Sequence, residues 1–172
     1  YENARKYFLL SLSYDMANND LNNVGHTYSR LGGVELDLNN YPEALRYYDL
    51  ADSSFRKAGN NNGINQVYVN RSIVFKHQGK FDQALDLLKR ALPFYRTQGL
   101  TDGIMAIWTH MSKIYAEKGM EDLTLAYFDS CQRLARQTDN IDRLQGIYDK
   151  MYFYYLESGD YKNALSAFVQ YT

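Results

Sequence analysis

The chain has 172 residues, 45% of them hydrophobic and 23% charged, and its 19 basic and 20 acidic side chains nearly balance. This balance gives no excess of positive charge to hold a nucleic acid, and without an apolar run of about 18 residues we expect no membrane contact by this segment. The single cysteine, Cys131, excludes an internal disulfide, so packing alone has to hold the fold together.

The sequence repeats every 40 residues. Ala44, Ala84 and Ala164 stand at the same place in three similar segments, and the same period meets Ala4 and Thr124. A fixed period of this length is typical of arrays in which each repeat stacks on its neighbours. We predict one array over residues 1–172, divided into the trailing helix of a preceding repeat at 1–20, full repeats at 21–60, 61–100 and 101–140, and a truncated fourth repeat at 141–172.

Each repeat is predicted to be a pair of antiparallel helices. An isolated helix B runs from Tyr1 to about Ala17, and the first full pair has helix A at about 23–38 and helix B at about 41–58. The pair then recurs three times, and the last helix B stops at Thr172, so nine helices are expected and both ends look cut from a longer chain. The predicted fold class is an all-α, right-handed α-solenoid.

Polar residues and glycines predict the helix ends. Short acceptor side chains are expected to cap the N-termini of the A helices at Asn22, Asn62, Asp102 and Asp142. Residue types that adopt the left-handed conformation easily are expected to end the A helices at Asn39, Gly79, Gly119 and Gly159, and the B helices at Asn19, Gly59, Gly99 and Asp139.

This pattern resembles the tetratricopeptide repeat, W-x2-L-G-x2-Y followed by A-x3-F. The matching residues are Trp108, Met111, Ser112 and Tyr115 with Thr124 and Phe128, and Tyr28, Leu31 and Gly32 with Ala44 and Tyr48. The period of 40 rather than 34 and the charged residues Glu35 and Arg71 depart from the family pattern. The links and helices are also similar in style to the repeat sensory regions of bacterial membrane-bound histidine kinases and related transcriptional regulators.

The resemblance implies that the A helices line a groove that binds a peptide or a partner protein. The A helices carry an aligned aromatic residue, and we call these residues the Tyr/Trp column: Tyr28, Tyr68, Trp108 and Tyr148. The position two residues later is expected to face this groove, with apolar residues among its neighbours to hold side chains. The expected groove residues are Arg30, Val69, Asn70, Ile73, Thr109, His110, Lys113, Asp149, Lys150 and Phe153. An ordinary solvated face explains the same residues, and both readings stay open.

The sequence predicts binding rather than catalysis. His26, His77 and His110 lie on different repeats without a second ligand at helical spacing, so no metal and no cofactor is expected. The first hypothesis is a scaffold for protein–protein or peptide binding, and the alternative is the signal-input region of a membrane-bound bacterial histidine kinase or transcriptional regulator. The segment is periplasmic in the sensor case and otherwise cytoplasmic, and self-association through the cut ends is an open alternative.

Glu35 and Arg71 occupy positions that their counterparts in other repeats fill with apolar groups. Burying either charge alone is costly. We therefore expect the two to pair across adjacent repeats or to turn outward.

Overall fold

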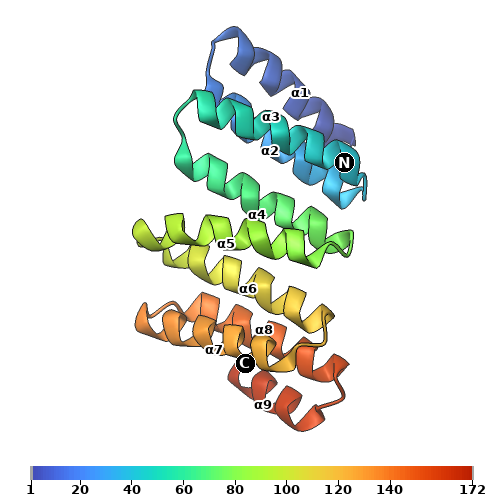
Figure 1. The fold of residues 1–172 in the computed structure, drawn as a ribbon, viewed down its shortest axis with the longest axis vertical. Coiled ribbons are helices and arrows are strands. Elements are labelled where there is room, and N and C mark those ends of the chain that lie inside the picture. The colour runs from blue at the N-terminus through green and yellow to red at the C-terminus, as the bar shows by residue number, and fades with distance from the viewer. Residues whose placement is uncertain (1, 172) are drawn as a thin grey trace. The chain divides into compact units, whose positions relative to one another are not determined.

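The computed structural model describes residues 2–171, and this part of the chain folds into helices joined by short links (Figure 1). The nine helices of the described range are α1 (Glu2–Ala17), α2 (Leu21–Asp37), α3 (Tyr41–Lys57), α4 (Asn61–His77), α5 (Phe81–Thr97), α6 (Thr101–Glu117), α7 (Glu121–Gln137), α8 (Ile141–Glu157) and α9 (Tyr161–Tyr171). The all-α class and the helix pairs are confirmed. The predicted limits at Tyr1 and Thr172 lie outside the described residues.

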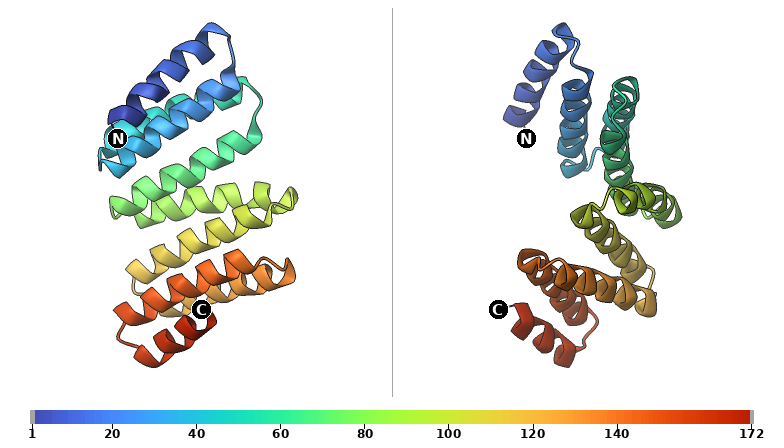
Figure 2. Two further views of the ribbon diagram at one scale, coloured as in Figure 1. Left: turned by 180° about the vertical axis from the view of Figure 1, so that it is seen from behind. Right: turned by 90° about the vertical axis from the view of Figure 1, so that its left-hand side faces the viewer.

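The chain divides into two compact units, and we describe each by itself. Unit 1 contains α1 to α4 and the part of α5 up to Phe94, and unit 2 begins at Tyr95 and continues through α6 to α9. Within each unit, successive helices run antiparallel (Figure 2).

The residues that end the helices were predicted correctly. All eight have positive φ, from 53° at Asn19 and Asp139 to 79° at Gly159. The amide of the next residue closes each turn, as when Asn60 N donates to Phe55 O at 2.9 Å. Glycine and asparagine adopt this left-handed conformation at low cost, so the chain reverses at these positions.

The predicted N-terminal caps are wrong by two residues. Helices α2, α4 and α8 begin after Asp20, Asn60 and Asn140, whose side-chain oxygens accept from the backbone N–H three residues later. The residues we expected as caps, such as Asn22, already lie in the first turn of the helix. The sequence misled us because short polar residues cluster here, at Asn60, Asn61 and Asn62 for example, and each of them could act as a cap.

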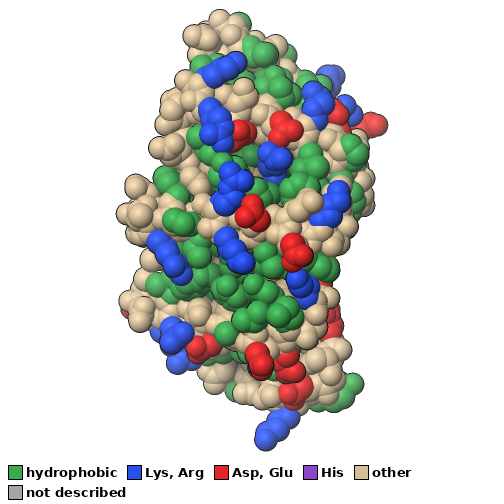
Figure 3. Space-filling view, in the orientation of Figure 1, with side chains coloured by type: hydrophobic (Ala, Val, Ile, Leu, Met, Phe, Trp, Pro, Cys, Tyr) green, Lys and Arg blue, Asp and Glu red, His purple; other side chains and the backbone are tan. Residues whose placement is uncertain are grey.

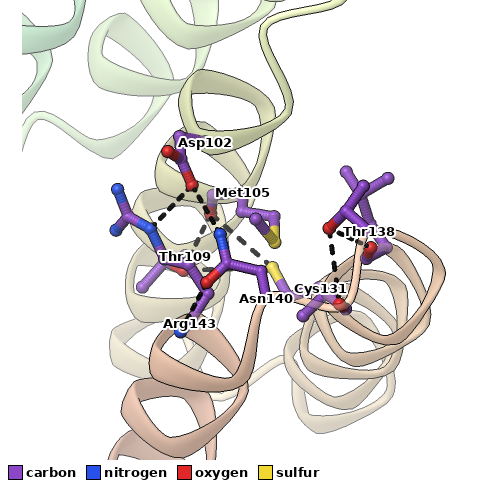
Figure 4. A network of polar contacts seen from close by, with 9 residues as sticks. Asp102, Met105, Thr109, Cys131, Thr138, Asn140 and Arg143 are labelled. Atoms are coloured by element: carbon purple, nitrogen blue, oxygen red, sulfur yellow. Dashed lines mark hydrogen bonds and ion pairs between the residues drawn. The ribbon is translucent and has the colours of Figure 1, made fainter.

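Residues that we wrongly expected as caps instead accept a hydrogen bond from the next repeat. Asn60 Nδ2 donates to Asn22 Oδ1 at 3.0 Å in unit 1, and Asn140 Nδ2 donates to Asp102 Oδ1 at 3.2 Å in unit 2. Arg143 Nε also donates to Asp102 Oδ1, at 3.0 Å (Figure 4). One asparagine therefore caps its own helix through its oxygen and ties it to the preceding A helix through its nitrogen.

The core of each unit combines small residues with large ones, as the repeat pattern predicted. In unit 1, Ala44 and Ala51 pack with Tyr48 and Phe55, all almost fully buried. The corresponding core of unit 2 is built around Met105, Phe128, Cys131, Ala135 and Ile147.

Glu35 and Arg71 do not pair with each other, and Glu35 does not turn outward either, so neither expected arrangement holds for Glu35. Glu35 is 2% exposed, accepts from Asn40 Nδ2 at 2.9 Å, and has Arg5 Nε 3.6 Å from its other oxygen. Arg71 Nη1 lies 2.8 Å from Asp49 Oδ1 on α3. Each charge thus finds its own partner, and α1 supplies one of them.

Candidate peptide-binding surface

The ten predicted groove residues are divided between the two units. Four of them stand in unit 1, on α2 and α4, and they are Arg30, Val69, Asn70 and Ile73. Six stand in unit 2, on α6 and α8, and they are Thr109, His110, Lys113, Asp149, Lys150 and Phe153. We therefore consider the two sets separately.

The unit 1 set does not form one open surface. The Arg30 guanidinium lies 5.9 Å from the centre of the Phe8 ring on α1. Val69 is 8% exposed, so its side chain belongs to the core instead of lining a groove. Asn70 and Ile73 are half-buried.

Thr109 in unit 2 also serves the packing. Its hydroxyl donates to Met105 O at 2.8 Å and lies 3.9 Å from Cys131 Sγ on α7 (Figure 4). The Cys131 thiol donates weakly to the same carbonyl, at 3.6 Å. Burial raises the pKa of Cys131 to about 11, so this thiol stays protonated at neutral pH. A buried, protonated thiol packs as a small apolar group.

Two lysines from α6 and α8 are close enough to influence each other. The pKa of Lys150 is lowered, first by burial and then by repulsion from Lys113, while Asp149 acts in the opposite direction. Lys150 Nζ donates to Gly146 O at 2.8 Å, and Lys113 is exposed. That these two positions face the same side stays a prediction.

An apolar side chain stands one turn beyond Lys150. Phe153 is 52% exposed, and its ring packs edge to face with Tyr152 at 5.1 Å between centres. His110 is half-buried on α6. We call Lys113, Asp149, Lys150 and Phe153 the lysine surface, since these four residues combine two cations and one anion with an exposed aromatic ring.

Each unit also has a small pocket beside the Tyr/Trp column, which was not predicted from the sequence. One pocket includes Lys57, and the other includes Arg133 and Gln137. The missed signal was the repeat itself, because corresponding positions 80 residues apart line both pockets. On the face drawn in Figure 3, Lys and Arg side chains are interspersed with exposed apolar ones.

Neither a metal site nor a membrane span is found among the described residues. No group of three or more His, Cys, Asp or Glu side chains in residues 2–171 is arranged to hold a metal ion. The helices in the same range are too short or too polar to cross a bilayer.

The antiparallel pairs and their 40-residue period place the chain in the class of helical-repeat proteins. The model of the tetratricopeptide repeat matches residues 23–97 of the chain. The resemblance seen in the sequence pattern is confirmed over this range. No curated protein matches it in sequence.

Solved structures share the fold at low sequence identity. BtubC (BKLC) from P. vanneervenii is 15% identical with a TM-score of 0.79, over 99% of this chain and 71% of that one. Aspartyl phosphate phosphatase F from Bacillus subtilis is 15% identical with a TM-score of 0.66, over 99% and 57%. A signal transduction ATPase with numerous domains from Pyrococcus horikoshii, described as having a tetratricopeptide repeat sensor, is 16% identical with a TM-score of 0.63, over 86% and 26%. At these identities the likeness shows the fold alone.

Proposed function

We propose that this chain is a protein-interaction module and that the lysine surface of unit 2 binds an acidic segment of a partner protein. The observation that carries the proposal is the exposed Phe153 ring one turn beyond Lys150, and repulsion from Lys113, which after burial lowers the pKa of Lys150, supports it. Phe153 beside them offers an apolar contact.

The electrostatics favour an anionic ligand. Two ammonium groups held near each other repel, and a carboxylate placed between them would add two attractions that outweigh this repulsion. Hydrogen bonds between charged groups are roughly twice as strong as neutral ones. Because the surface is open to solvent, the attraction is expected to weaken as salt rises.

Fluorescence polarisation with a labelled decapeptide of alternating Glu and Phe tests this function. We expect saturable binding that weakens at least threefold in each of Lys113→Gln and Lys150→Gln, and that falls steeply with added salt. Lys162→Gln, which removes an exposed lysine from the first turn of α9, is the matched control and should bind like the unchanged chain. Equal affinity in all three variants would refute the assignment of the lysine surface.

The sensor alternative has no observation of its own in favour of it. The structural neighbour with a repeat sensor shares the fold at 16% identity, which says nothing about a signal for this chain. We propose no catalytic residue, since the mechanism of binding needs none.

A further inference from the structure

Unit 1 contains a pocket of ≈ 310 Å³ between α1, α2 and α3. The Tyr28 ring from α2 and Leu50 from α3 form apolar walls, and Met16 at the end of α1 extends them. Ser53 and Lys57, both exposed on the C-terminal half of α3, form the polar rim. The pocket therefore combines an apolar interior with one cation at its edge.

Unit 2 contains a pocket of ≈ 210 Å³ between α6 and α7. All five residues that line it stand 80 positions after residues that line the pocket of unit 1. These pairs are Tyr28 and Trp108, Leu50 and Ser130, Ser53 and Arg133, Ser54 and Leu134, and Lys57 and Gln137. The repeat thus builds the same pocket in both units, with an aromatic ring in each and different side chains around it.

Two arginines lie at the pocket of unit 2. The Arg96 guanidinium lies 5.9 Å from the centre of the Trp108 ring, and Arg133 is on the pocket wall. Arg133 also pairs with Asp129 at 3.2 Å, but both side chains are more than 60% exposed, so this pair contributes little. An incoming carboxylate can compete for Arg133 at small cost.

In the repeat between the two pockets, a side chain of the chain itself covers the corresponding aromatic ring. Position 90 corresponds to Leu50 and Ser130, and it carries arginine. The Arg90 guanidinium lies 5.1 Å from the centre of the Tyr68 ring, which is the equivalent of Trp108. A long cation at this position therefore covers the aromatic ring, whereas serine at 130 leaves room above it.

We infer that the pocket of unit 2 binds one large apolar side chain of a peptide, with a neighbouring carboxylate of that peptide held by Arg133 or Arg96. Leu134 and the Trp108 ring receive the apolar group, and the two guanidinium groups supply the charge complementarity. The unit 1 pocket, with Lys57 as its cation, takes the same class of ligand.

This site is separate from the lysine surface. Trp108 and Lys113 are five residues apart on α6, which places them about 140° apart around the helix axis. The two sites can therefore be tested with different variants, and failure of one does not imply failure of the other.

Trp108 is the sole tryptophan of the chain, so its emission reports on this pocket directly. The probe is the capped tripeptide Ac-Asp-Leu-Asp-NH2, titrated into the intact chain. We expect a saturable change in Trp108 emission, and at least a threefold weaker response with Ac-Asp-Ala-Asp-NH2 and with Ac-Lys-Leu-Lys-NH2. Absence of a saturable change with the first peptide would overturn the inference, and so would equal responses to all three.

Ser130→Arg is the decisive variant because it copies Arg90 of the preceding repeat and adds positive charge. If the pocket takes the side chain, this variant loses the response at least tenfold. If the acidic peptide binds through charge alone, the response of Ser130→Arg stays the same or grows, and the proposed role of the pocket is refuted. Arg133→Gln, which keeps the pocket open, is expected to weaken binding at least threefold, and an unchanged affinity would contradict the role of Arg133.

Two controls complete the design. Leu50→Arg makes the equivalent change in unit 1 and should leave the Trp108 response unchanged. Lys113→Gln should also leave it unchanged, since it tests the lysine surface alone. Loss of the response in either control would show that the signal does not come from the pocket of unit 2.

Discussion

Two adjacent glycines on α2 give a prediction with opposite signs. A Cβ added to Gly32 would lie 2.6 Å from Cε1 of Tyr48, whereas a Cβ added to Gly33 meets nothing within 4 Å. Tyr48 is 2% exposed, so its ring has no room to move away. Gly32→Ala is therefore expected to destabilise the fold, and Gly33→Ala is expected to stabilise it.

The magnitudes follow from two effects. Alanine is favoured over glycine inside a helix by about 0.5 to 1 kcal/mol at either position. Overpacking a filled core costs about 1 to 3 kcal/mol, and this cost applies at Gly32 alone. The net expectation is a loss of about 1 to 2 kcal/mol in unfolding free energy for Gly32→Ala and a gain of about 0.5 to 1 kcal/mol for Gly33→Ala.

Urea unfolding followed by far-UV circular dichroism measures both changes. The two variants differ from the original chain by one methyl group each, at neighbouring positions of one helix, so each serves as control for the other. A stabilised Gly32→Ala, or equal shifts in the two variants, would show that Tyr48 does not close against this turn of α2.

Three further outcomes are expected. Leu100, the N-cap of α6, makes no side-chain cap bond, so Leu100→Asn should raise the unfolding free energy by about 1 kcal/mol in urea titrations, and a loss of stability would contradict this. Cys131, with its pKa raised by burial to about 11, should react with iodoacetamide at pH 8 far more slowly in the folded chain than in urea, and equal rates would disprove burial. Because Glu35 and Arg71 have separate partners, the destabilisations caused by Glu35→Leu and Arg71→Met should add within about 0.5 kcal/mol in a double-mutant cycle, and a larger coupling would restore their direct pairing.

The turns could be predicted from the sequence because their physical requirement is local. Only a few residue types adopt positive φ at low energetic cost. Residues such as Asn39 and Gly79 therefore indicate a helix end from their type alone. The N-caps failed for the opposite reason, since Asp20, Asn22 and Asn23 all have the chemistry of a cap and only the folded backbone selects one. Polar residues in clusters fix a helix start to within a turn, but not to a residue.

The partners of buried charges were beyond the sequence. Glu35 and Arg71 fall on adjacent repeats of the sequence, which made a pair between them the simplest hypothesis. The actual partners, Arg5 and Asp49, come from the B helices α1 and α3. Which side chain reaches a buried carboxylate depends on how helices cross, and a one-dimensional period carries no such information.

The candidate site was predicted in part for a similar reason. Lys113 and Lys150 stand on neighbouring A helices, and repulsion from Lys113 contributes to the lowered pKa of Lys150. Val69 and Thr109 turn toward the core and the packing between helices, since a residue one position away on a helix points about 100° elsewhere. The pockets were missed because each needs side chains from two or more helices, and no single motif records them.

The backbone repeats with a shorter period than the side-chain pattern does. Helices α2 to α8 each have 17 residues, and left-handed residues recur every 20 positions from Asn19 to Gly159. Only the side chains distinguish an A helix from a B helix, which doubles the period to 40. A gene that gains or loses 40 codons therefore keeps every turn and every face in register. A change of 20 codons would preserve the turns but exchange the two kinds of helix from that point onward.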